Sequence, residues 1–285
     1  MKNILVPTDF SENASKAALF AGEIAKRNGA VIYLMHAMDS EENSLHQPLF
    51  TGDESKKKRE AKKEKELIDF QHILGAIYEE VQIRPILETT DAKDAIIEIA
   101  RVKEIDLIIM GTRGAGIIKS RITGTITASV VAQSNLPVLV IPENYRIEEP
   151  DGILFATSHF ETEPEILNIL AKMAGLFSAA IHIVYFVNST EVNKLSPEES
   201  EQKVQEYLRL LKQTYPSISF RVELLEGTDF EAALQLYHSV HETDITAMVH
   251  YPKGFWDQLF LRDQTKKLVF HSNRPVLVIP CKKPL

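Results

Sequence analysis

Short apolar runs alternate along the chain with longer segments in which apolar residues recur at helical spacing. In the first half, this pattern predicts five strands, with a helix between each strand and the next. Such alternation is typical of parallel strands joined by right-handed crossovers, with helices on both faces of the sheet. Pro85 removes one hydrogen-bond donor from the third strand, which is therefore expected at a sheet edge. The predicted strands are residues 4–6, 31–38, 81–87, 107–110 and 138–141.

Capping residues predict where the helices begin and end. Ser11 suits the N-cap of a helix that runs to about residue 28, and Gly29 suits its end. Asp91 suits the N-cap of a helix over residues 92–103, and a last helix is expected over 125–133. After a polar stretch, a long helix begins with charges that alternate in sign at helical spacing, which predicts a solvated face. Its apolar side is expected to comprise Leu67, Phe70, Ile73, Leu74 and Ile77.

The sequence contains an internal repeat. SNLPVLVIP at 134–142 recurs as SNRPVLVIP at 272–280, and ILVPTD at 4–9 recurs as ILFATS at 153–158. A polar link containing proline and glycine separates the two copies, and the first copy carries extra residues in its middle. We therefore expect two α/β domains in tandem, each with a doubly wound parallel sheet. The expected domains are 1–145 and 146–285.

Composition and charge narrow the classes of function. A net charge of −8 disfavours nonspecific binding to nucleic acids or anionic membranes. The single cysteine, Cys281, excludes an internal disulfide and fits a reducing compartment. Neither an apolar signal segment nor an apolar run of membrane-spanning length is present in the sequence. These features predict a cytoplasmic protein.

Glycines follow the fourth predicted strand and precede a helix. Gly111, Gly114 and Gly116 come first, and Gly124 stands just before the helix that begins near Thr125. Glycines allow backbone N–H groups to converge on a phosphate, and a helix start adds unpaired N–H groups. The alternative is that these glycines only serve a tight turn.

Two common nucleotide motifs do not fit this segment. The lysine-containing phosphate loop G-x-x-x-x-G-K-[ST] is missing from the sequence. A Rossmann fingerprint would need a third glycine at Lys119 and should follow the first strand of its unit.

The spacing Gly111-x2-Gly114-x9-Gly124-Thr125 resembles the ATP-binding signature of the universal stress protein family. The opening ILVPTDFS and the closing NLPVLVIP resemble the first and last strands of that family, so the resemblance covers residues 1–142 and, more weakly, the rest. It implies an adenine nucleotide alpha hydrolase-like fold with strand order 3-2-1-4-5 in each domain. That order would reverse between strands 1 and 4 and bring the end of strand 1 beside the glycine loop.

The resemblance implies an ATP site in the first domain, with or without Mg²⁺. Pro7, Thr8 and Asp9 would face the nucleoside, with Asp9 accepting hydrogen bonds or helping to hold the metal ion. Alternatively, Asp9 serves as a cap at the N-terminus of the following helix. The backbone of Ala37 would meet adenine. The other implied residues line the nucleoside pocket or hold the phosphates: Met110, Gly111, Arg113, Gly114, Gly124, Thr125, Ile126 and Thr127.

The second copy departs from this pattern. Val249, Pro252 and Arg262 replace the three glycines of the signature, Ser158 replaces Asp9, and Asp263 replaces Thr125. We therefore expect no ATP in the second domain. Its bulky residues either fill the vacated pocket or form a partner surface: Phe255, Trp256, Leu259 and Phe260.

We expect no metal ion bound by side-chain ligands, because the closest histidine pair, His238 and His241, lacks a third ligand. The sequence also offers no obvious general base beside Asp9, which disfavours efficient hydrolysis.

These features predict a stress-response nucleotide-binding module, not an enzyme, with an unknown protein partner. A scaffold or carrier of another small ligand, and a slow ATPase, are the alternatives. The fifth strand is an apolar edge flanked by Pro137 and Pro142. Such an edge predicts pairing of the two copies as an intrachain pseudo-dimer, or pairing between chains as a homodimer.

Overall fold

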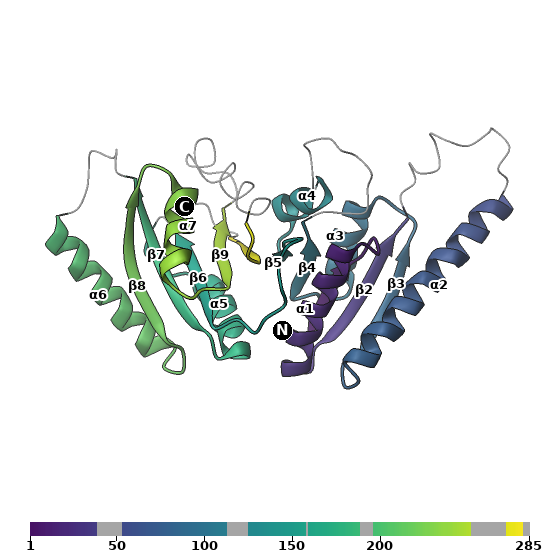
Figure 1. Cartoon of the computed structure of the whole chain (residues 1–285), viewed down its shortest axis with the longest axis horizontal. Coiled ribbons are helices and arrows are strands. Elements are labelled where there is room, and N and C mark those ends of the chain that lie inside the picture. The colour runs from purple at the N-terminus through teal and green to yellow at the C-terminus, as the bar shows by residue number, and fades with distance from the viewer. Residues whose placement is uncertain (39–52, 113–124, 158, 189–195, 252–271, 282–285) are drawn as a thin grey trace. The chain divides into compact units, whose positions relative to one another are not determined.

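The computed structural model describes residues 1–38, 53–112, 125–157, 159–188, 196–251 and 272–281. The chain divides into two compact units, Met1–Ile147 and Glu148–Leu285. Within these described residues, each unit contains five parallel strands, with helices in the connections (Figure 1).

In the first unit the strands lie in the order β3-β2-β1-β4-β5. Helix α1 packs against α2, and α3 packs against α4, so the two pairs cover the sheet from opposite faces (Figure 1). This arrangement confirms the expected α/β fold, and β3 with Pro85 lies at the edge. The elements are β1 (Asn3–Pro7), α1 (Glu12–Asn28), β2 (Val31–Ala37), α2 (Asp53–Ile77), β3 (Ile83–Glu88), α3 (Ala92–Val102), β4 (Leu107–Gly111), α4 (Thr125–Gln133) and β5 (Val138–Ile141).

Local signals account for most element ends. The Ser11 side chain accepts a hydrogen bond from the Ala14 N–H, and Gly29 closes α1 with a left-handed φ of 68°. Asp91 caps α3 as expected. Strand β3 begins at Ile83, two residues later than expected, because the chain turns after α2 with a hydrogen bond from the Val81 N–H to the Tyr78 carbonyl.

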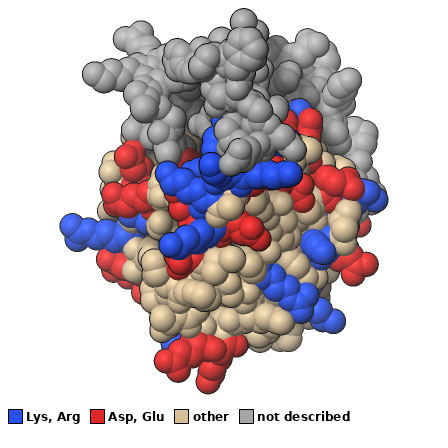
Figure 2. Space-filling model, turned by 90° about the vertical axis from the view of Figure 1, so that its right-hand side faces the viewer, with Lys and Arg blue, Asp and Glu red and all other residues tan. Residues whose placement is uncertain are grey.

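The buried face of α2 is narrower than the sequence predicts. Leu67 and Leu74, seven residues apart, are each 1% exposed, whereas Ile73 is 61% and Ile77 is 55% exposed. The expectation that both isoleucines pack inward was wrong. Ile73 lies about 100° around the helix from Leu74, and Ile77, although one turn beyond Leu74, is at the end of α2 and stays exposed. Figure 2 faces the α2 side of the first unit, where Lys and Arg lie interspersed with Asp and Glu, as alternating charges predict.

The second unit repeats the same strand order, as β8-β7-β6-β9-β10. Equivalent positions keep equivalent pairing: Gly111 of β4 lies opposite Ile141, and Val249 of β9 lies opposite Ile279. Ser178 ends α5 with a left-handed φ of 55°, as Gly29 ends α1. The elements are β6 (Gly152–Thr157), α5 (Pro164–Phe177), β7 (Ala180–Asn188), α6 (Pro197–Thr214), β8 (Phe220–Gly227), α7 (Phe230–Val240), β9 (Ile245–His250) and β10 (Val276–Pro280).

None of the helices in the described part of the chain combines the length and apolar character that crossing a membrane requires.

Candidate functional site

The carboxyl ends of β1 and β4 meet in the first unit. Ile4 pairs with Leu107 and Leu5 pairs with Ile108, which brings Pro7 level with Met110. The next strand outward is β2 on one side and β5 on the other, so the strand order reverses here. Doubly wound sheets bind ligands at such a point, beyond the carboxyl ends of the strands. Ala37 ends the neighbouring strand β2 at the same edge.

Asp9 stands in the turn between β1 and α1. Its Oδ1 accepts a hydrogen bond from the Ser11 N–H at 3.1 Å, and the Thr8 hydroxyl oxygen accepts one from the Phe10 N–H at 3.0 Å. Phe10 has a left-handed φ of 65°, which costs energy for a residue with a side chain. The two side chains hold this strained turn, and the Asp9 carboxylate therefore has a structural role at the edge of the sheet.

Gly111 allows a close approach between β4 and α1. A Cβ at this position would lie 2.7 Å from Nδ2 and 2.8 Å from Cγ of Asn13. Asn13 is 4% exposed and donates a hydrogen bond from Nδ2 to the Thr112 hydroxyl at 3.2 Å. A hydrogen bond thus spans the point where the strand order reverses. The sequence interpretation missed Asn13, although it is a polar residue on the otherwise alanine-rich buried face of α1.

Helix α4 is attached to the end of β4. The Thr127 hydroxyl donates a hydrogen bond to the Gly111 carbonyl at 2.8 Å, and Thr127 is 5% exposed. Thr127 therefore uses its hydroxyl hydrogen on the backbone of the sheet. Ile126 beside it is 42% exposed. Three predicted phosphate residues lie outside the described residues, as does the Thr125 side chain: Arg113, Gly114 and Gly124.

An aromatic cluster lies beside Asp9 at the end of β2. His36 donates a hydrogen bond from Nδ1 to the Thr8 carbonyl at 2.8 Å, and its ring centroid lies 4.5 Å from that of Phe10. Lys63 of α2 places Nζ 5.0 Å from the Phe10 ring centroid. Burial, and to a smaller extent the Lys63 charge, lower the pKa of His36, although its hydrogen bond to Thr8 acts in the opposite direction. The sequence interpretation did not find this cluster, because Lys63 belongs to a charged run that reads as solvated.

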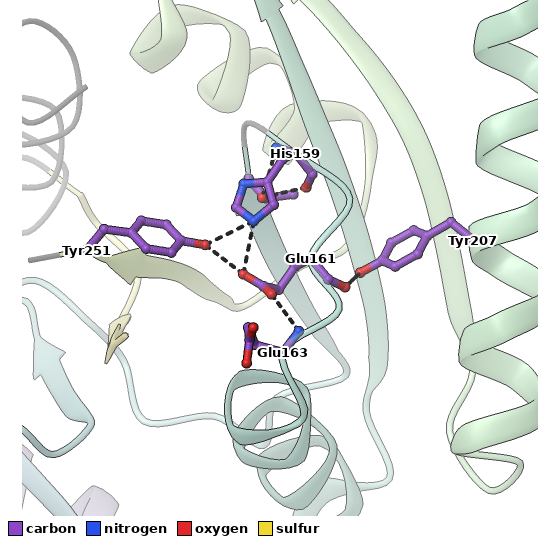
Figure 3. A network of polar contacts seen from close by, with 6 residues as sticks. His159, Glu161, Glu163, Tyr207 and Tyr251 are labelled. Carbon is purple, nitrogen blue, oxygen red and sulfur yellow. Dashed lines mark hydrogen bonds and ion pairs between the residues drawn. The ribbon is translucent and has the colours of Figure 1, made fainter. Parts of the chain in front are cut away.

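The equivalent point of the second unit is built differently. Val249, 4% exposed, fills the position of Gly111. The segment after β6 holds a buried carboxylate, Glu161, which Tyr251 contacts from the end of β9 (Figure 3). The other replacements that the sequence identified lie outside the described residues: Ser158, Pro252, Arg262, Asp263, Phe255, Trp256, Leu259 and Phe260.

The histidine pair of the second unit has other partners. His238 bonds through its two ring nitrogens to the hydroxyls of Thr243 and Thr246, at 2.6 and 2.9 Å. His241 contacts Arg221. Across the described ranges, no three His, Cys, Asp or Glu side chains are grouped so that they could hold a metal ion.

Comparison with known proteins identifies relatives of the first unit. The family model described as "Universal stress protein family" matches residues 1–142. A universal stress protein of Thermus aquaticus is 33% identical over 143 residues, which cover 49% of this chain and 98% of that protein. One from Methanocaldococcus jannaschii is 27% identical over 164 residues, covering 49% of this chain and 94% of the relative.

A solved structure shares the two-unit fold along the whole chain. The crystal structure of a universal stress protein from Archaeoglobus fulgidus matches 98% of each chain with a TM-score of 0.73, at 18% identity. Fold and strand-end geometry define a tandem α/β protein with two doubly wound units. With the sequence matches, they show that this chain belongs to the universal stress protein family.

Proposed function

We propose that the first domain binds ATP, with or without Mg²⁺, and that the chain is a nucleotide-responsive binding module in the cytoplasm. One observation carries this proposal: the pairing of β1 with β4 aligns Pro7 with Met110 where the strand order reverses. The segment that follows β4 in the sequence has the Gly111-x2-Gly114-x9-Gly124-Thr125 spacing.

The surroundings of this point suit the two ends of a nucleotide. Toward β2, Ala37 offers backbone groups, and the rings of Phe10 and His36 lie close together. Toward β5, helix α4 begins at Thr125, so its N-terminal N–H groups and positive dipole end are on the side proposed for the phosphates. Since the Thr127 hydroxyl already donates its hydrogen to the Gly111 carbonyl, we assign phosphate binding mainly to backbone N–H groups and Arg113.

Calorimetric titration with MgATP tests this proposal. We expect binding of about one ATP per chain, and loss of that binding in Gly114→Val. Gly75→Val is the matched control, because a Cβ at Gly75 has open space around it within α2. No heat in the wild type, together with a nucleotide-free mass of the purified chain, would reject ATP binding. Equal affinity for ATP, AMP and phosphate would favour the scaffold or carrier alternative.

We propose binding without efficient turnover. Phosphate release measured over many equivalents of ATP distinguishes this from a slow ATPase. Steady release that disappears in Asp9→Ala would support the enzyme, whereas recovery of intact ATP supports the binding module.

The partner proposals rest on the sequence. The SNLPVLVIP and SNRPVLVIP segments are proposed to pair within one chain or between two chains. Light scattering separates these alternatives, because only the second gives the mass of a dimer.

A further inference from the structure

The second domain places a buried carboxylate where its strand order reverses. β6 pairs with β9 through Leu154 and Thr246, so the residues that follow these strands lie at the same edge. Glu161, between β6 and α5, is 1% exposed. Tyr251 directly follows β9 and points toward it (Figure 3).

Three hydrogen-bond donors converge on this carboxylate. The Tyr251 hydroxyl lies 2.6 Å and His159 Nε2 lies 3.2 Å from Oε2, while the Glu163 N–H lies 2.7 Å from Oε1. They come from the end of β9, the segment after β6 and the start of α5. Both oxygens are therefore bonded, which offsets the cost of burying a charged group.

The histidine is oriented for donation. His159 Nε2 also lies 3.1 Å from the Tyr251 hydroxyl, so one N–H faces two oxygen acceptors. Nδ1 of His159 is buried, and within the described part of the chain it has no hydrogen-bond partner. A proton on Nδ1 would find no acceptor there, and the geometry favours the tautomer with its hydrogen on Nε2.

The backbone that carries Glu161 is also fixed. Tyr207 of α6 donates a hydrogen bond from its hydroxyl to the Glu161 carbonyl (Figure 3). The neighbouring Phe160 ring stacks on Tyr185 with centroids 5.0 Å apart and meets Tyr207 edge-on at 5.3 Å. The carboxylate is therefore positioned by its surroundings as well as by its own hydrogen bonds.

The first domain joins the corresponding strand ends through neutral groups. There, the Asn13 amide donates to the Thr112 hydroxyl at 3.2 Å, again joining the segment after its first strand to the end of its fourth. In the second domain, the bridge between the strand ends has a charged acceptor with convergent donors instead. The Asp9 carboxylate of the first domain accepts a hydrogen bond from the Ser11 N–H within its own turn. Convergent hydrogen-bond donors are what an anion-binding site requires. Here the anion is the Glu161 carboxylate, which belongs to the chain itself.

We propose that the second domain retains an anion-binding site at its strand-order reversal and that the Glu161 carboxylate permanently occupies it. The chain's own carboxylate thereby closes this domain to small carboxylates and other oxyanions, including the phosphates of a nucleotide. Shortening Glu161 opens the site and leaves its three donors in place for an external carboxylate of similar size.

Rescue of Glu161→Ala by formate tests this inference. Thermal unfolding is measured near neutral pH in sodium formate and in sodium chloride at equal ionic strength. We expect Glu161→Ala to have a lower Tm than the wild type in chloride and to regain part of the loss in formate. The wild type should show no such difference between the salts. Adding Tyr251→Phe to Glu161→Ala removes one donor and should weaken the formate effect.

Glu165→Ala is the matched control, because Glu165 is an exposed carboxylate in the first turn of α5, four residues after Glu161. It should keep a Tm near that of the wild type in both salts. The same formate response in Glu165→Ala, or none in Glu161→Ala, would overturn the proposal.

Should Glu161→Ala not fold in chloride, its refolding yield is compared in the two salts, and equal yields would overturn the proposal too. Since these measurements contain no nucleotide, a failed ATP titration leaves this inference standing.

Discussion

The Tyr251 hydroxyl lies 2.6 Å from a carboxylate oxygen of Glu161, and this hydrogen bond joins residues 90 positions apart in the sequence. It ties the end of β9 to the segment that follows β6. The strand-order reversal of the second domain is thus closed by a charged hydrogen bond in which the acceptor is buried. The stability of this domain should consequently depend on the ionisation of Glu161.

Acid should weaken this contact. Burial alone would raise the pKa of Glu161, but the hydrogen bonds from His159, Tyr251 and the Glu163 N–H outweigh it and lower that pKa. Because the pKa is lower in the folded state, the ionised group stabilises the fold above its unfolded pKa of about 4.3. This stabilisation is lost as pH falls through the folded pKa. Denaturant unfolding should show Glu161→Gln less stable than wild type at neutral pH, with the gap closing below about pH 4.

The control for that experiment is Glu165→Gln, which changes an exposed carboxylate. Its free energy of unfolding should follow the wild type at every pH. A gap for Glu161→Gln that stayed constant down to about pH 3 would contradict the lowered pKa.

His238 should make stability depend on pH in a higher window. Burial, followed by the nearby Arg274 charge, lowers its pKa to about 4. The folded state then binds fewer protons than the unfolded state, whose histidine pKa is about 6.5. The free energy of unfolding is therefore highest above about pH 6.5, and protonation linked to His238 lowers it by up to about 3 kcal/mol toward pH 4. In His238→Gln, the free energy of unfolding should change less between these pH values.

The exposed His72 gives the matched control for His238. We expect His72→Gln to keep the wild-type pH dependence in the same denaturation series. An unchanged slope in His238→Gln would show that another group causes the dependence.

Gly111→Ala should destabilise the first domain by about 1–3 kcal/mol, as expected for overpacking. The new Cβ would lie 2.7 Å from Nδ2 of Asn13, which is buried and bonded to Thr112, and 3.2 Å from the Asn13 backbone carbon. Chemical denaturation measures this loss. In an Asn13→Ala background most of the clash is removed, so Gly111→Ala should lower the free energy of unfolding by less than it does in the wild type. If the two substitutions had additive effects on this free energy, Asn13 would not be the obstacle.

Gly22→Ala should also destabilise the first domain by about 1–3 kcal/mol. Its Cβ would lie 2.2 to 2.6 Å from ring atoms of Tyr78, which is 7% exposed. The Tyr78 hydroxyl lies 2.9 Å from the Leu19 carbonyl and 3.0 Å from a Glu23 carboxylate oxygen, so moving the ring breaks contacts between α1 and the end of α2. Gly175→Ala in α5, which meets nothing within 4 Å, should be neutral or stabilising in the same assay.

MgATP should stabilise the first domain selectively. At about 100 times its Kd, a ligand that binds only the folded state adds about 2.7 kcal/mol to the free energy of unfolding. Hydrogen exchange with and without MgATP should therefore slow at backbone amides of β1 and β4, and not at those of β6 and β9. Protection in both domains would contradict the assignment of one ATP site.

Much of the fold was predictable because its signals are local. The Ser11 and Asp91 caps and the alternation of apolar runs depend on residues a few positions apart, and the structure has these elements within about two residues. The exposure of Ile73 and Ile77 was not predictable from apolar character alone, because it depends on how much of α2 the sheet and α1 cover. The proposed ATP residues remain predictions.

The sequence by itself determined the tandem repeat, the α/β class and the identity of the residues at each strand end. Only the tertiary structure decided that Gly111 gives room to Asn13, and that Glu161 accepts hydrogen bonds from Tyr251, His159 and the start of α5. Periodicity and caps report interactions within one helix or strand. A contact between strand ends depends on strand order, register and the packing of side chains, which arise only when the separate segments come together.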